Sequence, residues 1–380
     1  MKTEINIGKI SNVKIWITDN HMAKNQWSAI KKFVLIKIKT YDGVEGWGEA
    51  FTINLREKAI VNLIAELSQE ISNIENLTLK SFYQKIFILS DGHRGLDFSA
   101  ATSAIEIALW DITGKIKNLP LNSLLTNKPK LNVSIYATCW SSFRINTDQY
   151  LNQVQKYLDK KYSGIKVYPM KDNLKSSIKF VEQARELVGD EYPLMLDLAI
   201  PENLDNTMIF LKEVSSLKPY WIEEPVDGEN ISMLSKIKNN FGMKVVTGEK
   251  QCGLPHFQEL ISRGAADILN PDISGVGGII DMIKISEESL DHNISISPHC
   301  WNSMSVSASA MLHVCASISN SEMAEIFPDY IEFSKEFCEL SFEIENNEAY
   351  LNQKPGLGII IDEKSLSELS EYITEVKLNA

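Results

Sequence analysis

The chain carries three apolar runs that each end in an acid: Pro193-Leu-Met-Leu-Asp197, Tyr220-Trp-Ile-Glu223 and Val245-Val-Thr-Gly-Glu249. Asp197, Glu223 and Glu249 are spaced by two equal intervals of 26 residues, which is about the length of one strand–helix unit. An apolar run followed by a polar residue is typical of a strand buried on both faces of a parallel sheet. At the ends of successive strands of a β/α barrel, the three carboxylates would converge at the barrel mouth.

These three acids predict a metal site. Three hard oxygen ligands favour Mg²⁺ or Mn²⁺ over a metal that prefers thiolates. One acid after a strand is often only a helix N-cap, but three in register favour a shared cation. We therefore expect Asp197, Glu223 and Glu249 to hold a divalent cation.

The same pattern continues on both sides of the three acidic strands. Upstream, residues 133–140 and 164–169 are strand-like, and the second run places Lys166 and Tyr168 on one face. Downstream, strand-like residues 266–272, 294–299 and 323–325 end in Asp272, His299 and Glu325. Helical stretches lie between the strands at residues 149–162, 174–187 and 278–290. Eight strand candidates of this kind predict a modified (β/α)8 barrel over residues 131–330.

The first 125 residues have a different order of elements. Strand-like residues 13–18, 33–39 and 46–50 come first, and helical residues 57–71, 79–89 and 100–115 follow, which predicts an α+β domain. After Glu325 we expect a short strand near residues 340–344 and a polar, helix-like tail. The tail, residues 340–380, is predicted to pack back on the first domain.

Composition restricts the possible partners. The chain of 380 residues is longer than a typical single barrel, in agreement with a second domain. It has 38 basic and 50 acidic residues, a net charge of −12, which argues against nucleic acid and anionic membranes. No run of about 18 apolar residues and no signal-peptide pattern occurs, so no membrane span is expected. Five cysteines without CxxC pairs suit a reducing cytoplasm.

Several motifs give the chain a specific resemblance. It resembles the enolase superfamily, within it the mandelate racemase subgroup (mandelate racemase/muconate lactonizing enzyme-like), over nearly its whole length. The shared motifs are Gly46-Trp-Gly-Glu-Ala50, Ala108-Leu-Trp-Asp-Ile-Thr-Gly-Lys115, Trp221-Ile-Glu-Glu-Pro225, Thr247-Gly-Glu249, Asn270-Pro-Asp-Ile-Ser-Gly-Val-Gly-Gly278 and Ser297-Pro-His299. The resemblance implies an α+β capping domain in front of the barrel.

The resemblance also implies roles for individual residues. Asp197, Glu223 and Glu249 would be the Mg²⁺ ligands, one ion per site. Asp272 and His299 would form a dyad, and Glu325 would be the electrophilic acid, although Glu322 is a nearby competitor for that role. Glu224 is expected to support the site and not to bind the metal.

The physical reason for this set is the weak acidity of a proton α to a carboxylate. Mg²⁺ on the substrate carboxylate stabilises the enediolate charge that develops when the proton leaves. A base with a pKa near the working pH must then face the α-carbon. His299, oriented and made more basic by Asp272, is the candidate.

Tyr168 indicates which reaction the site performs. Racemases of the subgroup carry Lys-x-Lys on the second strand, whereas this chain has Lys166-Val-Tyr168. A tyrosine with an ordinary pKa of about 10 is a poor base at neutral pH, while Lys166 can still hold the substrate carboxylate. Members without the second lysine look like acid-sugar dehydratases, so we interpret the chain as a hydro-lyase acting on an aldonate or aldarate. Tyr168 could also be a second acid, a base, or only a packing ring.

Other residues are predicted to contact the substrate. The loop Asp91-Gly-His-Arg-Gly95 and the polar loop after the first strand are candidate lids, and bulky side chains are expected at the barrel mouth. The predicted substrate-binding residues are Asn20, His21, Arg94, Trp140, Lys250 and Trp301. The expected product is a 2-keto-3-deoxy acid, and a homo-oligomer is expected.

Two other functions stay open at this point. A racemase, epimerase or cycloisomerase could use the same scaffold with Tyr168 as the second acid–base group. A non-catalytic sugar-acid binding protein is the third possibility, against which the complete set of three ligands and a dyad argues.

Overall fold

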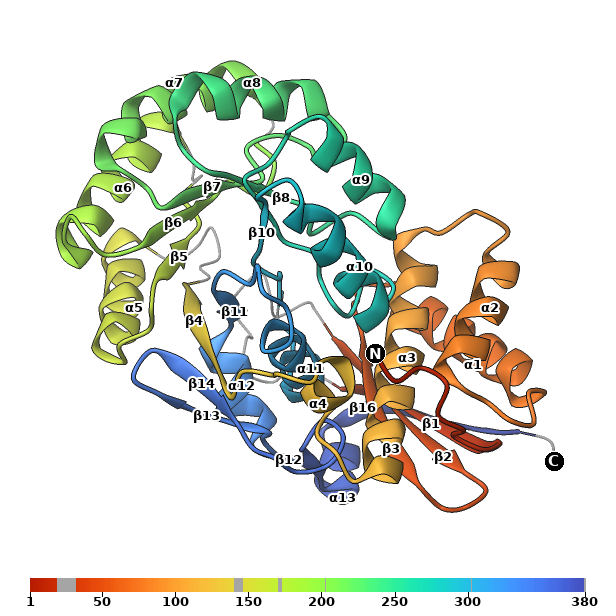
Figure 1. The fold of residues 1–380 in the computed structure, drawn as a ribbon. Helices are drawn as coiled ribbons and strands as arrows, with labels where there is room; N and C mark the ends of the chain where they lie inside the picture. The colour runs from red at the N-terminus through yellow and green to blue at the C-terminus, as the bar shows by residue number, and fades with distance from the viewer. Residues whose placement is uncertain (19–31, 140–145, 170–172, 202, 302, 379–380) are drawn as a thin grey trace.

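The computed structural model describes residues 1–380 except 19–31, 140–145, 170–172, 202, 302 and 379–380. Two parts lie side by side (Figure 1). One is an α+β part built from both ends of the chain, and the other is a part in which strands and helices alternate. No helix within the described ranges is both long and apolar enough to cross a membrane.

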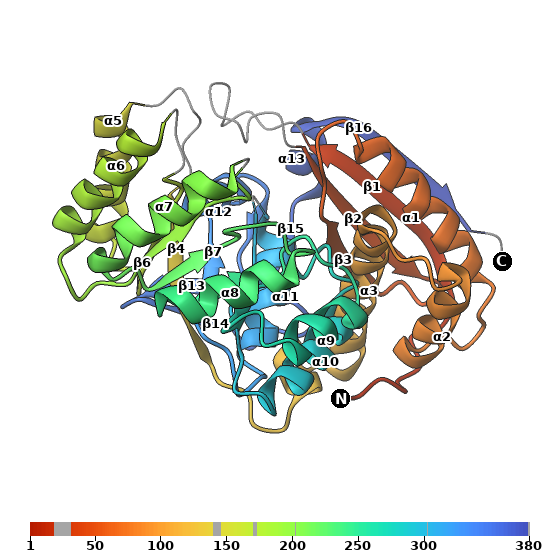
Figure 2. The same ribbon diagram turned by 90° about the horizontal axis from the view of Figure 1, so that it is seen from above.

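The α+β part is a four-stranded antiparallel sheet covered by helices. Its strand order is β16-β1-β2-β3, with bounds Ser370–Lys377, Ile10–Thr18, Phe33–Thr40 and Glu45–Ala50. Helices α1 (Glu57–Ser72), α2 (Leu79–Ser90) and α3 (Leu96–Lys117) follow the three N-terminal strands. The blue strand β16 runs along β1 (Figure 2), so the end of the chain belongs to this sheet.

The prediction of a helix-like tail is wrong for residues 370–377. Only α13 (Glu363–Glu368) is helical there, and Ser370–Lys377 forms strand β16. Its side chains alternate between half-buried and exposed positions, which is the period of a strand. Pairing with β1, which lies more than 350 residues away in sequence, decides the conformation of this polar segment.

The second part contains a ring of parallel strands. Within the described residues there are eight, each pairing in parallel with its neighbour along the chain up to β10, while β11 pairs with β4. Ile296 donates a backbone hydrogen bond to Asn320 (2.9 Å) and accepts one from Glu322 (2.8 Å), which joins β10 to the segment before β11. The strands are β4 (Asn132–Cys139), β5 (Ile165–Val167), β6 (Leu194–Asp197), β7 (Trp221–Glu223), β8 (Val245–Thr247), β9 (Ile268–Leu269), β10 (Ser295–Ile296) and β11 (Ala324–Ile326). The predicted β/α barrel with an N-terminal α+β domain is confirmed.

A helix follows each barrel strand, and Figure 1 shows the helices outside the strands. Asparagine side chains begin four of them: Asn146, Asn173, Asn203 and Asn230 each accept a hydrogen bond from a backbone N–H of the first turn. Such caps satisfy N–H groups that have no partner within the helix. The helices are α5 (Thr147–Asp159), α6 (Leu174–Val188), α7 (Leu204–Val214), α8 (Ile231–Phe241), α9 (Leu254–Ser262), α10 (Ile279–Leu290), α11 (Ser305–Cys315) and α12 (Pro328–Ser334).

Short elements connect the two parts. The hairpin of β13 and β14 extends the barrel sheet, because β14 pairs antiparallel with β4, and β12 pairs with β15. The five cysteines are buried and free. The bounds of the remaining elements are α4 (Leu121–Leu125), the 3-10 turn η3 (Ser215–Leu217), β12 (Cys338–Glu339), β13 (Phe342–Glu345), β14 (Glu348–Leu351) and β15 (Ile360–Ile361).

Two glycines let strand β3 lie directly on helix α3. A Cβ atom at Gly46 would lie 2.2 Å from the carbonyl oxygen of Ala108, and one at Gly48 would lie 1.9 Å from that of Ala104. Only glycine permits so close an approach. The Gly-x-Gly part of the β3 motif is therefore a packing requirement, and it fixes the position of Glu49, the next residue.

A buried histidine of α11 predicts how stability depends on pH. Burial lowers the pKa of His313 from 6.5 to about 4. Its ring lies 3.3 Å from both the backbone nitrogen of Asn122 and the carbonyl oxygen of Leu357. Below about pH 6.5, His313 is protonated in the unfolded chain, whereas in the folded protein it stays neutral down to about pH 4. Acid therefore favours the unfolded state over this range.

Replacement of His313 by Gln removes this titration. Between pH 6.5 and 4 the wild type should lose on the order of 2–3 kcal/mol of unfolding free energy more than the variant does. Urea denaturation of both proteins across this range measures the difference. Parallel pH profiles would contradict the assignment.

Candidate active site

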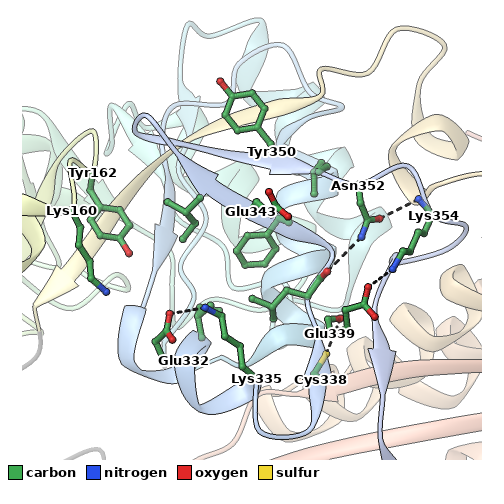
Figure 3. Close-up of a pocket in the computed structure, with 15 residues that line it drawn as sticks. Lys160, Tyr162, Glu332, Lys335, Cys338, Glu339, Glu343, Tyr350, Asn352 and Lys354 are labelled. Atoms are coloured by element: carbon green, nitrogen blue, oxygen red, sulfur yellow. Dashed lines mark hydrogen bonds and ion pairs between the residues drawn. The ribbon is translucent and has the colours of Figure 1, made fainter.

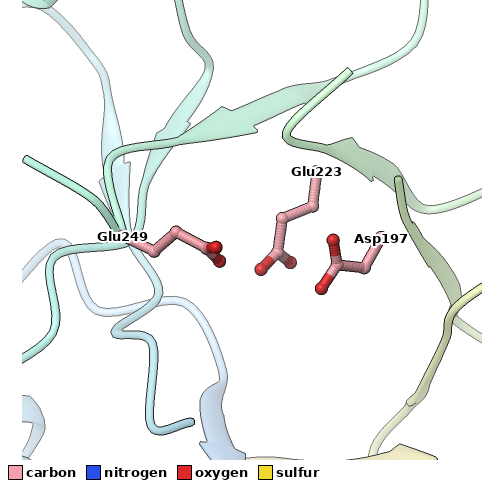
Figure 4. Close-up of side chains that lie close together, drawn as sticks. All are labelled: Asp197, Glu223 and Glu249. Atoms are coloured by element: carbon pink, nitrogen blue, oxygen red, sulfur yellow. The ribbon is translucent and has the colours of Figure 1, made fainter. Parts of the chain in front are cut away.

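Three carboxylates meet at the C-terminal ends of neighbouring barrel strands. Asp197 ends β6, Glu223 ends β7, and the two residues are directly paired across the strands. Glu249 lies two residues beyond β8. Figure 4 shows the three side chains pointing toward one another, with one oxygen from each within 4.8 Å of the others. The three acids that are equally spaced in the sequence therefore form one cluster in the structure.

The central acid, Glu223, is held by three donors. Its Oε1 accepts hydrogen bonds from Lys166 Nζ (2.6 Å) and Asn270 Nδ2 (3.1 Å), and its Oε2 accepts one from Trp221 Nε1 (3.2 Å). Asn270 was not among the predicted site residues. Its position two residues before Asp272 was the only sequence signal for it.

Lys166 is the buried cation of the cluster. Its Nζ lies 2.6 Å from Glu223, 2.7 Å from Glu325 and 3.5 Å from Asp197. Burial alone would lower the pKa of Lys166, but Glu223 and Glu325 raise it well above the ordinary value. The ammonium therefore serves the protein's own acids as a counter-ion.

One ammonium does not balance the negative charge at this place. Burial and the neighbouring acids raise the pKa of Glu223 to about 8. Burial likewise raises the pKa of Glu249 to about 7, although His299 opposes the shift. Among the described residues, the buried Oε2 of Glu249 accepts no hydrogen bond, although His299 Nε2 lies 3.4 Å from it. A divalent cation fits the excess of acidic oxygens.

His299 and Asp272 form a tight pair on the next two strand ends. His299 Nδ1 lies 2.8 Å from Asp272 Oδ2, and a parallel backbone bridge joins the two residues. Asp272 Oδ1 accepts hydrogen bonds from both the backbone nitrogen (2.9 Å) and the hydroxyl (2.5 Å) of Ser274. The other ring nitrogen, Nε2, lies 3.4 Å from Glu249. Burial lowers the pKa of His299, but Glu249 and Asp272 raise it to about 9.

Glu325 is fully buried in the middle of β11. Its oxygens accept hydrogen bonds from Thr138 Oγ1 and from the backbone nitrogen of Cys300 (2.8 Å), in addition to the contact with Lys166. Burial raises its pKa, but Lys166 and His299 produce a net lowering. The competitor Glu322 points elsewhere, to Tyr220 and Lys244.

A cavity of about 500 Å³ lies in front of these groups. Tyr168, which lines it, has its pKa raised to about 12 by burial and by Asp197, so its hydroxyl is protonated at neutral pH. Of the predicted substrate-binding residues, Lys250 and Trp301 line the cavity. The lining also includes residues that the sequence did not indicate: Phe51, Ile53, Leu96, Thr138, Ala199 and Phe327.

Of the other predicted substrate contacts, only Arg94 lies among the described residues. Arg94 is not part of its lining, since its guanidinium forms an ion pair with Asp281 of α10 (2.9 Å). Asn20, His21 and Trp140 lie outside the described residues. Glu224 Oε1 accepts hydrogen bonds from Thr247 Oγ1 (2.6 Å) and from the backbone nitrogen of Gly248 (3.1 Å), and its supporting role stays a prediction.

A larger hollow lies below the β13–β14 hairpin (Figure 3). Four of its charged side chains form ion pairs, Glu332 with Lys335 and Glu339 with Lys354. No cluster of metal-binding side chains lies among its lining residues within the described chain. The smaller cavity at the barrel mouth is therefore the candidate active site.

The fold and the cavity together define a class of protein: a capped β/α barrel enzyme with an acidic metal site and a His–Asp pair at the strand ends. Comparison with protein families agrees. Residues 149–365 match the model described as "Enolase C-terminal domain-like", and residues 13–126 match the "Mandelate racemase / muconate lactonizing enzyme, N-terminal domain". The chain belongs to the mandelate racemase/muconate lactonizing enzyme group of the enolase superfamily.

Curated relatives are sugar-acid enzymes. D-gluconate/D-galactonate dehydratase of Picrophilus torridus is 28% identical over 90% of this chain and 89% of its own length. D-galactarolactone cycloisomerase of Agrobacterium fabrum is 26% identical over 95% and 98%. The relatives named dehydratases are hydro-lyases, which confirms the prediction of a lyase. The predicted domain boundaries stay predictions.

Solved structures share the whole fold. An enolase from the environmental genome shotgun sequencing of the Sargasso Sea is 70% identical, covers 98% of this chain and 99% of its own, and has a TM-score of 0.96. L-talarate dehydratase of Polaromonas sp. JS666, complexed with Mg and L-glucarate, is 20% identical over 98% and 99%, with a TM-score of 0.82.

The acid cluster predicts a metal-binding defect in a single variant. Glu223→Gln removes one charged ligand, so the affinity for Mg²⁺ should fall at least about 10-fold while the fold survives. Isothermal titration calorimetry measures the affinity, and circular dichroism checks the fold. Glu322→Gln is the matched control, because this acid lies outside the cluster, and it should bind Mg²⁺ like the wild type. Equal affinity of all three proteins would exclude Glu223 as a ligand.

Proposed function

We propose that the chain is a Mg²⁺-dependent acid-sugar dehydratase that converts an aldonate or aldarate into a 2-keto-3-deoxy acid. The observation that carries this proposal is the arrangement of His299. Its Nδ1 is held by Asp272, while its Nε2 faces the three-carboxylate cluster in the same cavity. A substrate carboxylate at the cluster would bring its α-carbon near this nitrogen.

Asp197, Glu223 and Glu249 would hold the cation. Mg²⁺ would supply Lewis-acid stabilisation of the substrate carboxylate while negative charge develops on it. The solved complex of L-talarate dehydratase with Mg and L-glucarate supports this choice. Mn²⁺, a cytoplasmic location and a homo-oligomeric state stay predictions.

His299 would move the proton. Glu249 is the charge that raises the pKa of His299 most, and a cation held by Glu249 would offset that charge, so that Nε2 would be free to accept a proton. With Nδ1–H donated to Asp272, Nε2 then takes the proton from the α-carbon, and the electron pair of the C–H bond forms the double bond between C2 and C3. The bond from C3 to its hydroxyl breaks, and the proton on Nε2 leaves with that hydroxyl as water. The resulting enol then becomes the 2-keto acid. Lys166 contacts Glu223 and Glu325 and offsets part of the negative charge of the site.

Tyr168 favours elimination over racemisation. Racemisation needs a second base, and a tyrosine whose pKa is about 12 is not a base at neutral pH. Its protonated hydroxyl instead can donate a hydrogen bond within the cavity. The Lys166-x-Tyr168 pair thus leaves His299 as the single base.

A cycloisomerase is the second candidate. The relative named D-galactarolactone cycloisomerase supports it, since its reaction class uses the same scaffold. A cycloisomerase rearranges a lactone without releasing water from C3. Product analysis by nuclear magnetic resonance on a panel of aldonates, aldarates and their lactones separates the two functions.

Two variants test the division of labour. His299→Asn should reduce dehydration by about 10²–10⁴-fold or more, because the base is lost, and should eliminate exchange of the α-proton with D₂O. Tyr168→Phe should slow turnover but leave the exchange measurable. His256→Asn is the control, because His256 hydrogen-bonds the Cys252 carbonyl (2.9 Å) and does not line the cavity.

The opposite pattern would overturn the assignment. Exchange that persists in His299→Asn and disappears in Tyr168→Phe would make Tyr168 the base. The histidine would then serve as the acid for the leaving hydroxyl.

A further inference from the structure

Helices α10 and α11 are among the barrel helices that begin without a side-chain cap of their own. Helix α10 follows the segment that carries Asp272, and helix α11 follows the segment that carries His299. Neither helix has a hydrogen bond from its N-cap side chain, in contrast to α5, α6 and α7. At the start of each helix, two backbone N–H groups are instead bonded by an acid of the capping domain.

Glu106 of α3 caps helix α10. Its Oε2 accepts a hydrogen bond from the backbone nitrogen of Ile279 (2.6 Å), and its Oε1 accepts one from Ile280 (3.1 Å). Trp110 Nε1 (3.0 Å) and the Tyr83 hydroxyl (2.9 Å) also bond to Oε1.

A glycine makes room for this carboxylate. A Cβ atom at residue 278 would lie 1.5 Å from Glu106 Oε2, and Gly278 has a φ of +105°. The end of the Asn270–Gly278 motif is therefore shaped to receive an acid from the other domain.

Glu49 of β3 caps helix α11 in the same way. Its Oε1 accepts a hydrogen bond from the backbone nitrogen of Met304 (2.9 Å), and its Oε2 accepts one from that of Ser307 (2.8 Å). The side chain is only 2% exposed. Met304 lies five residues beyond His299.

Further bonds tie the dyad segments to the capping domain. The hydroxyl of Ser103, on α3, accepts a hydrogen bond from Gly277 N (3.0 Å). The backbone nitrogen of Phe51 donates to the carbonyl of Ser274 (2.9 Å), two residues beyond Asp272. The metal ligands, by contrast, lie on β6, β7 and just beyond β8, which pair within the barrel.

We propose that Glu49 and Glu106 are positioning residues that hold the His299–Asp272 pair in place through helices α11 and α10. This role builds on the proposed function, in which His299 is the base. The capping domain thereby sets the geometry of the proton-transfer pair, while the barrel alone sets the metal site.

The test compares three alanine variants that each remove a helix cap and are each expected to lower the stability of the protein. Glu49→Ala removes the cap of α11, and Glu106→Ala removes the cap of α10. Thr78→Ala is the control: the Thr78 side chain caps α2 of the capping domain by accepting a hydrogen bond from Ser81 N (3.0 Å). All three should lower Tm. Only the first two should lower kcat, by about 10-fold to 100-fold, with KM and Mg²⁺ affinity changed less than about 3-fold. Glu49→Gln and Glu106→Gln keep one acceptor oxygen and should restore part of kcat.

A second readout does not depend on the reaction. The Nδ1–H of His299, bonded to Asp272, should give a low-field proton resonance, assigned by its absence in His299→Asn. This resonance should shift or broaden in Glu49→Ala and Glu106→Ala, and it should stay unchanged in Thr78→Ala. If the alanine variants do not fold, the two glutamine variants are measured in their place. An unchanged resonance, or a kcat no lower than that of Thr78→Ala, would overturn the positioning role. A shifted resonance in a protein that dehydrates no acid sugar would contradict the proposed function alone.

Discussion

The arrangement of the site depends on one buried ammonium shared among carboxylates. Lys166 contacts Glu223 and Glu325 directly and Asp197 at 3.5 Å. Burial of an ion costs several kcal/mol unless partners compensate it, and here the acids outnumber the cation. Burial, together with the neighbouring acids, raises the pKa values of Glu223 and Glu249. A divalent cation would supply the missing positive charge, and the three acids and the lysine would then form one electrostatic unit.

This constraint changes the interpretation of the Lys166-x-Tyr168 motif. From the sequence, Lys166 was expected to hold the substrate carboxylate, yet its ammonium is already engaged by the protein's acids. Contact with substrate stays a prediction for this residue. Its observed contacts are with Glu223, Glu325 and Asp197, whose negative charge it offsets in part at the buried barrel mouth.

The barrel was readable from the sequence because its information is local and repeated. Each strand–helix unit places its polar end residue at the same edge, so equal spacing in sequence becomes proximity in space. Strand β16, the apolar cavity residues Phe51 and Leu96, and the Arg94–Asp281 ion pair were not readable in the same way. They depend on how the capping domain docks on the barrel, and no local period encodes that contact.

The motif residues of the capping domain gain a physical explanation from this docking. Gly46 and Gly48 bring β3 onto α3, and the acids beside these packed surfaces, Glu49 and Glu106, reach the barrel helices. The aromatic ring of Phe51, two residues past Glu49, lies 5.8 Å from Trp301 and 6.5 Å from His299 between ring centroids. One short strand therefore contributes to domain packing, to a helix cap and to the cavity wall.

The central claim is that the three strand-end acids hold the cation. The most direct measurement is a crystal structure of the protein soaked with Mn²⁺, with data collected at the manganese absorption edge. The account predicts one anomalous peak in each chain, within coordination distance, about 2.0–2.3 Å, of oxygens from Asp197, Glu223 and Glu249. A peak at any other place, with none between these three acids, would contradict it.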